Sequence, residues 1–115
     1  MKIVIVEELI TFEELKKIAQ EFYVSMIKGA VDIEREIVAF GGEYHMDANL
    51  ALLDRGSQQS NIWGFNLLLE KQGDEWIEYT SLINIRPLKG NKGMEIIDPN
   101  IRDKVKKIVN KKIQR

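Results

Sequence analysis

The chain lacks cysteine altogether and contains a single histidine, His45, among 115 residues. Without cysteine there are no disulfide bonds, no thiolate metal ligands and no cysteine nucleophile. One imidazole also excludes a zinc site built from several histidines of one chain. The composition therefore removes much of metalloenzyme chemistry, and we expect neither a metal site nor another cofactor.

Long apolar runs are missing as well. No stretch approaches the roughly 18 consecutive apolar residues that a membrane span needs, and the N-terminus lacks the pattern of a secretory signal. We therefore expect a cytoplasmic protein with no membrane partner. The length, with 44% hydrophobic and 30% charged residues, is typical of one globular domain, so residues 1–115 are expected to share one core.

Basic residues gather towards the C-terminus. From Arg86 to Arg115 there are ten Lys and Arg against three Asp and Glu, a net charge of +7, and residues 1–85 carry −8. This separation would fit an RNA contact, which would be electrostatic and weakened by salt. No aromatic or arginine-rich element accompanies the lysines, so a solvated helix face, or pairing of charges within the molecule, is the favoured interpretation.

Hydrophobic periodicity predicts an α+β fold, a largely antiparallel meander sheet of about five or six strands with two amphipathic helices packed on one face. Residues 2–6 are a continuous apolar run, typical of a strand that is buried on both faces and internal to the sheet. Thr11 and Glu14 fit a capping box, and apolar spacing continues to Ile27, with Gly29 placed to end the helix.

The middle and the end of the chain carry further patterns. Residues 31–33 and 37–40 predict a hairpin or a bulged strand. Polar and apolar residues alternate over 43–53, which predicts a half-buried strand, although a helix over 46–53 is an alternative. Residues 61–70 and 76–86 predict paired strands with Glu70 opposite Trp76. Asp98 and Pro99 predict the start of a second helix.

One face of this predicted sheet would collect polar side chains. His45 and Asp47 lie two residues apart, so Asp47 could orient an imidazole that acts as a general base; these are the candidate catalytic residues. The candidate ligand-binding residues on the same face are Glu43, Asn66, Asn84 and Arg86. Antiparallel sheets commonly leave one polar face to solvent, so an inert surface is the alternative interpretation.

Several segments resemble a family of small prokaryotic proteins of unknown function. They are Val31 to Arg35, Gly41-Gly42-Glu43 with His45 and Asp47, Trp63-Gly64 with Asn66, and Ser81 to Pro87 with Gly90-Asn91. The likeness covers most of the chain, and the family carries no activity to transfer. Its motif residues coincide with the polar face and add Asn91 to the candidate ligand-binding residues. Glu36 departs from the pattern, standing where glycine would ease the preceding turn.

Three functions follow from these patterns, and whether the protein is an enzyme is left open. The favoured one is a binding or regulatory module that holds a small polar or anionic ligand or a protein partner. A homodimer joined through the polar face would bury Ile62, Trp76 and Leu82. The second is a hydrolase with His45 as base and Arg86 as anion anchor, and the third is an RNA-associated protein.

Overall fold

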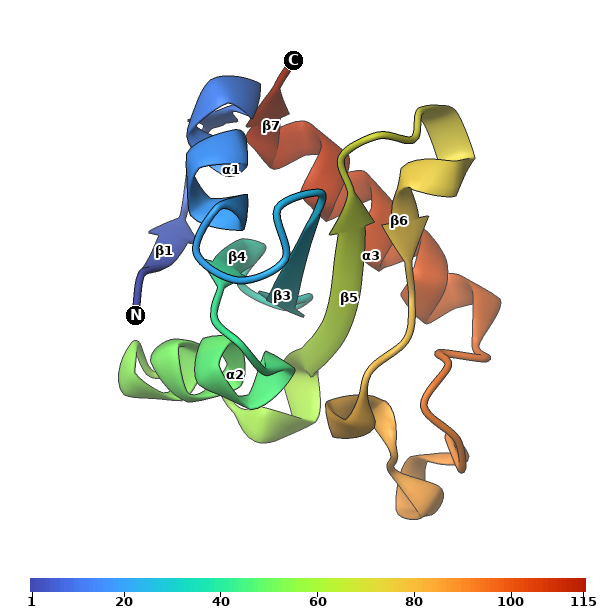
Figure 1. Cartoon of the computed structure of the whole chain (residues 1–115). Coiled ribbons are helices and arrows are strands. Elements are labelled where there is room, and N and C mark those ends of the chain that lie inside the picture. The colour runs from blue at the N-terminus through green and yellow to red at the C-terminus, as the bar shows by residue number, and fades with distance from the viewer.

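The computed structural model describes all 115 residues as an α+β fold built on a five-stranded antiparallel sheet (Figure 1). The strand order is β1-β4-β3-β5-β6, so β1 pairs with β4 rather than with its neighbour in sequence. The strands are β1 (Ile3–Val6), β3 (Met26–Asp32), β4 (Ile37–Gly41), β5 (Ile62–Leu68) and β6 (Ile77–Glu78). Two further short strands, β2 (Ile10–Thr11) and β7 (Ile113–Gln114), pair in parallel and join the two ends of the chain.

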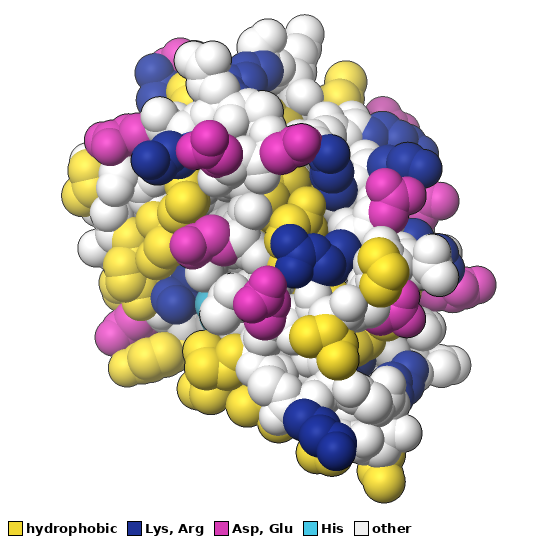
Figure 2. Space-filling model, turned by 90° about the vertical axis from the view of Figure 1, so that its right-hand side faces the viewer, with side chains coloured by type: hydrophobic (Ala, Val, Ile, Leu, Met, Phe, Trp, Pro, Cys, Tyr) yellow, Lys and Arg dark blue, Asp and Glu magenta, His cyan; other side chains and the backbone are white.

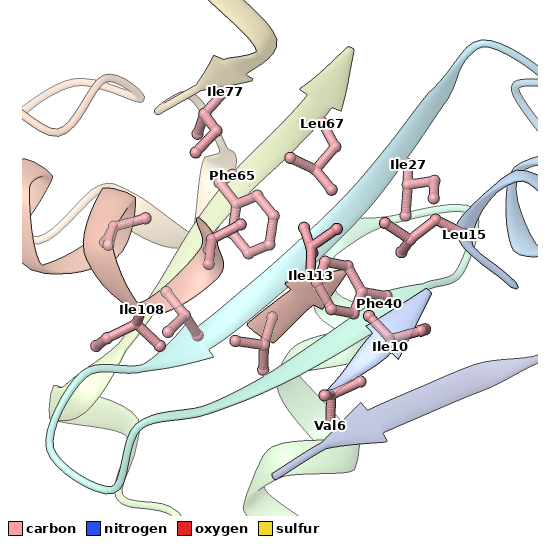
Figure 3. Close-up of a cluster of buried hydrophobic side chains, with 14 of the residues drawn as sticks. Val6, Ile10, Leu15, Ile27, Phe40, Phe65, Leu67, Ile77, Ile108 and Ile113 are labelled. Carbon is pink, nitrogen blue, oxygen red and sulfur yellow. The ribbon is translucent and has the colours of Figure 1, made fainter. Parts of the chain in front are cut away.

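Three α-helices cover the sheet: α1 (Phe12–Ala19), α2 (His45–Asp54) and α3 (Pro99–Lys112). Helices α1 and α3 pack on one face, where Leu15 and Ile108 meet Phe40 and Phe65 in the larger core cluster (Figure 3). Helix α2 lies on the opposite face, where a second cluster forms around small side chains of β3 and β4. None of the helices is long and apolar enough to cross a membrane.

Helix α1 begins where the sequence predicts and ends earlier. Thr11 accepts the N–H of Glu14, and the Glu14 carboxylate accepts the N–H of Thr11, so the capping box is confirmed. The helix stops because the chain turns back: the Val24 N–H donates to the Ala19 carbonyl, and Val24 adopts a left-handed φ of 64°. The prediction that this helix continues to Ile27 is therefore wrong.

The hairpin between β3 and β4 is confirmed. Asp32 Oδ1 accepts the N–H groups of Glu34 and Arg35, which closes the turn. Glu36 completes it with a left-handed φ of 56°, at the position where the sequence suggested that glycine would be easier. The turn is thus built by Asp32 at its start and tolerates a strained residue at its end.

The first strand is an edge strand, not an internal one. Strand β1 pairs only with β4. Its apolar run is continuous because both faces are covered, with Val4 and Val6 against the larger cluster and Ile3 and Ile5 against the smaller. Only Val6 is buried, and Ile3, Val4 and Ile5 are half-buried, so the apolar run indicated contacts on both faces but neither full burial nor a place inside the sheet.

Residues 45–54 form helix α2, so the strand predicted over 43–53 is wrong. Gly41 and Gly42 adopt φ angles of 116° and 96°, which turn the chain out of the sheet. The helix then buries Ala48 and Leu52, four residues apart, against the sheet. The segment is thus a short helix, the alternative that Leu and Ala favoured, and its buried face mixes polar His45 and Asn49 with Ala48 and Leu52 while Met46 and Leu50 face solvent.

Strands β5 and β6 pair with Asn66 opposite Glu78 and Leu67 opposite Ile77, two residues away from the predicted register. A shift of two keeps the side chains of the paired residues on their predicted faces, but β6 covers only Ile77–Glu78 of the strand predicted over 76–86. Trp76, expected at the polar face, is buried and donates its Nε1–H to Asn110.

Two of the three residues assigned to a homodimer interface are therefore unavailable. Ile62 and Trp76 are both buried within the chain, and only Leu82 is exposed. Tyr44, within the strand predicted over 43–53, is exposed at the residue before α2. The symmetric dimer through the polar face loses the apolar contacts on which it was argued.

Gly29 lies within β3, where its cross-strand neighbours are Phe40 and Phe65. The two rings meet edge to face over the glycine, with 5.9 Å between their centroids. A Cβ at Gly29 would lie 2.4 Å from Cζ of Phe65, so any side chain at this position would force the Phe65 ring to move. Gly29 is therefore a packing residue and does not end a helix as predicted.

Replacing Gly29 with alanine is expected to lower the free energy of unfolding by about 1–3 kcal/mol, because the added methyl group displaces the Phe65 ring. Urea denaturation measures the change. Gly93→Ala is the matched control, since a Cβ there meets no atom within 4 Å. Equal stability of the two variants would contradict this packing role.

Candidate functional site

A hollow of about 450 Å³ opens where the start of α2 meets β3, β5 and the segment after β6. We call it the His45 pocket. It is lined by Lys28, Tyr44, His45, Met46, Asn66, Thr80, Ser81, Leu82, Ile83 and Met94. Its volume falls in the range of roughly 300–1,000 Å³ that is usual for small-molecule sites. Its walls are mostly apolar, and a few polar groups converge at one end.

The imidazole of His45 is fixed by two oxygen atoms of β5. Its Nε2 lies 2.8 Å from Asn66 Oδ1 and 3.0 Å from the carbonyl oxygen of Phe65. Both atoms are acceptors, so Nε2 carries the proton and donates. The other nitrogen, Nδ1, is then an unprotonated acceptor that has no hydrogen-bond partner in the chain and is not sealed from solvent. Figure 2 shows the ring in cyan at the molecular surface, beside a basic side chain.

Burial is the main reason that the pKa of His45 is lowered from 6.5 to about 4. The positive charge of Lys28 lowers this pKa further, while the hydrogen bonds to Asn66 and Phe65 raise it in part. The imidazole is therefore neutral at neutral pH. It presents a hydrogen-bond acceptor, and not a positive charge, to the pocket.

Lys28 supplies the positive charge of the pocket. It lies opposite Asn66 across β3 and β5, and its ammonium group makes no ion pair with a carboxylate. Its one specific contact is with the Tyr23 ring, whose centroid lies 5.2 Å from Nζ. The pocket thus holds a cation without a counter-ion.

Asn66 links the histidine to the neighbouring strand. Its Oδ1 faces His45, and its Nδ2 donates to Glu78 Oε1 at 3.3 Å and to the Thr80 carbonyl at 3.4 Å. The carboxamide is fully used by these contacts, so its orientation is set by its neighbours. No group of three or more His, Asp and Glu side chains is placed to hold a metal ion.

The model of a family described as a protein of unknown function, DUF5674, matches residues 4–112. The chain belongs to this family. The family found here is thus one of unknown function, as the resemblance implied, and its prokaryotic distribution stays a prediction. No curated protein and no solved structure matches the chain. Function within this family has to be argued from the pocket itself.

Asp47 does not face the histidine. Its Oδ2 accepts the N–H groups of Glu43 and Tyr44, which lie just before α2, and so the carboxylate closes the start of the helix. Glu43 is exposed, and its carbonyl oxygen accepts the hydroxyl proton of Tyr23. The paired arrangement of His45 and Asp47 that the sequence suggested depended on a strand, and the helix removes it.

Asn84 and Asn91 are tied to the backbone. Asn84 accepts the Gly64 N–H at 2.7 Å and donates back to the Gly64 carbonyl at 3.0 Å, so its carboxamide pairs with β5 as a strand would. Asn91 Nδ2 donates to the carbonyl groups of Asn84, Gly93 and Glu95. Both side chains are buried. These contacts hold segment 81–97 in place, although it contains no α-helix or strand and only two short 3₁₀ helices, Leu82–Asn84 and Pro87–Lys89.

Arg86 is engaged in the same way. Its guanidinium stacks on the Trp63 ring, 4.4 Å from the centroid, and donates to the carbonyl groups of Ser60 and Ile62. It lines a different hollow from His45. Of the predicted site residues, the structure brings together His45 and Asn66 and separates them from Arg86, Asn84 and Asn91.

Sequence reasoning missed Lys28 because the helix was extended over residues 20–27. The sequence did contain a sign that Lys28 is a candidate site residue, because Lys28 is the one charged residue in the apolar run from Met26 to Val31. Tyr44 and Met46 were missed as pocket residues because the strand predicted over 43–53 is a helix, and Leu82 was assigned to a dimer interface rather than to a pocket.

The low pKa of His45 makes stability depend on pH. The unfolded chain takes up a proton near pH 6.5, and the folded chain does so only near pH 4. The free energy of unfolding should therefore fall as the pH drops through this window, by about 3 kcal/mol from His45 alone. His45→Gln, which keeps a donor near the Nε2 position, should lose this part of the dependence. Identical pH profiles of the two proteins in denaturant titrations would contradict the buried neutral imidazole.

Asn84→Ala is expected to destabilise the fold by about 2–3 kcal/mol, because it leaves the buried N–H and C=O of Gly64 without partners. Hydrogen exchange should quicken across 81–97. Asn100→Ala, at an exposed position of α3, is the control and should change little. If Asn84 served only to contact a ligand, Asn84→Ala would leave the free energy of unfolding of the ligand-free protein unchanged.

Proposed function

We propose that this protein is a binding module that holds a small anionic ligand in the His45 pocket. The observation that carries the proposal is Lys28, a cation without a carboxylate partner at the edge of a hollow. An ammonium group in a partly enclosed site attracts a carboxylate or phosphate more strongly than it would in open water.

The neighbours of Lys28 suit such a ligand. The open Nδ1 of His45 accepts a hydrogen bond, so a ligand hydroxyl or a protonated acid group beside the anion is favoured. The Thr80 hydroxyl lines the same hollow and has no partner within the chain. One cation, one acceptor and one hydroxyl give a ligand a preferred orientation.

A binding role is favoured over the hydrolase alternative by the position of Asp47. Its carboxylate is occupied by two backbone N–H groups, so no acid orients His45. Arg86, the proposed anion anchor, lies in another hollow with its donors engaged. The RNA alternative is weakened because Lys106 and Lys111 of the basic helix pair with Asp74 and Glu36.

Titration of the protein with acetate and with inorganic phosphate, followed by NMR, tests the proposal. An anion beside the imidazole should raise the pKa of His45 from about 4 towards 6.5, because a negative charge favours the protonated ring. Lys28→Met should weaken anion binding at least about tenfold, which corresponds to about 1.4 kcal/mol.

Lys17→Met is the matched control, since Lys17 is exposed on α1 and forms no ion pair. An anion response that survives Lys28→Met, or one lost equally in both variants, would count against the proposed site. Acetate and phosphate that leave the His45 resonances unmoved would also refute it.

A further inference from the structure

Two hollows of the molecule share a wall. The His45 pocket and a second hollow of about 520 Å³ are both lined by Met46, Leu82 and Ile83. The second continues to Ile85 and Leu88, and we call it the Leu88 groove. We call the two adjoining hollows together the trough; its lining extends from Lys28, past Met46 in the first turn of α2, to Leu88.

Apolar side chains stand open along this trough. Leu82 is 70% exposed and Leu88 is fully exposed, and Met46 and Ile85 also rank among the large apolar residues that face solvent. Figure 2 shows yellow side chains gathered in the lower part of that view. A contiguous apolar surface of this kind on a small domain marks a contact site.

The backbone that carries these side chains is held in place. Asn84 bonds to Gly64 of β5 and to the Met94 carbonyl, and Asn91 bonds to the carbonyl groups on both sides of the turn. Leu82, Ile85 and Leu88 therefore project from a braced loop, which does not have to be ordered when a ligand binds. Such preorganisation lowers the cost of binding.

The charges give the trough a direction. At the Leu88 end, Arg86 and Lys89 also lack carboxylate partners, but each already donates hydrogen bonds to backbone carbonyl groups, those of Ser60 and Ile62 for Arg86 and that of Ser60 for Lys89. At the other end, Lys28 makes no ion pair and lines the same hollow as His45, close enough for its charge to lower the pKa of the imidazole. The site for an anionic head is therefore at Lys28, and the apolar wall leads away from it.

We propose that the trough binds a free amphipathic carboxylate, with its head at Lys28 and its hydrocarbon tail along Met46, Leu82 and Leu88. This inference rests on the proposed function and specifies the ligand class of the same pocket. A wholly polar anion would leave the exposed apolar wall unused, and an uncharged hydrocarbon would leave Lys28 without a partner.

Isothermal titration of the full chain with straight-chain carboxylates from butanoate to decanoate, all as monomers in solution, tests the inference. Affinity is expected to rise about threefold to fourfold for each added methylene until the tail passes Leu88. Lys28→Met should weaken decanoate binding at least about tenfold. Leu82→Asp should flatten the dependence on chain length, and Leu9→Asp, at a site 63% exposed elsewhere, should leave it intact.

The outcomes separate the two proposals. If acetate and decanoate bind with equal affinity and both depend on Lys28, the proposed contact of the tail with the apolar wall is wrong and the anion site stands. If decyltrimethylammonium, a cation with the same tail, binds as tightly as decanoate, the anion site at Lys28 is overturned and with it the proposed function. An affinity for carboxylates that Lys28→Met leaves unchanged would overturn both in the same way.

Other occupants of the trough give their own results. A dimer in sedimentation experiments that Leu82→Asp dissociates and decanoate does not compete with would assign the wall to a second copy. Binding to anionic phospholipid vesicles without binding of monomeric carboxylates would assign it to a membrane surface. Either result would overturn the inference.

Discussion

The contact between His45 and Asn66 organises the candidate site. It joins the first turn of α2 to the centre of β5, and it sets the imidazole as an Nε2–H donor. Burial then keeps the ring neutral, with its pKa lowered to about 4, so Nδ1 is left as a hydrogen-bond acceptor in a pocket that Lys28 also lines. A charged imidazole here would repel Lys28 and close the site to cations and donors alike. The character of the pocket therefore depends on one hydrogen bond across two elements.

Buried amides perform a second task. Asn84 and Asn91 satisfy backbone groups that a strand would have satisfied, which lets the chain from Ser81 to Ile97 remain irregular and still be fixed. This arrangement permits apolar side chains such as Leu82 and Leu88 to face solvent from a defined backbone. Polar residues inside and apolar residues outside are the reverse of the usual distribution, and the combination places the segment at a binding surface.

Much of the fold was predictable because its signals are local. The capping box at Thr11, the proline start of α3 and the turn after Asp32 each act within a few residues. The alternation over 43–53 misled because a short helix with Ala48 and Leu52 buried gives the same polar and apolar sequence as a strand. In the candidate site, too, local signals were read from the sequence and contacts between distant segments were not. His45 and Asn66 were found by residue type, whereas Lys28 required knowing that the chain turns at Val24 and that β3 pairs with β5. Asn84 and Arg86 were named as candidate ligand-binding residues, and in the structure their side chains bond to backbone groups of β5 and of Ser60 just before it.

The account depends most on the state of one ring, and a long-range ¹H–¹⁵N spectrum of the His45 imidazole at neutral pH measures it directly. The structure predicts a neutral ring protonated on Nε2, with an Nδ1 resonance that moves when acetate is added and stays in place in Lys28→Met. A ring protonated on Nδ1, or an imidazolium at neutral pH, would contradict the account of the pocket.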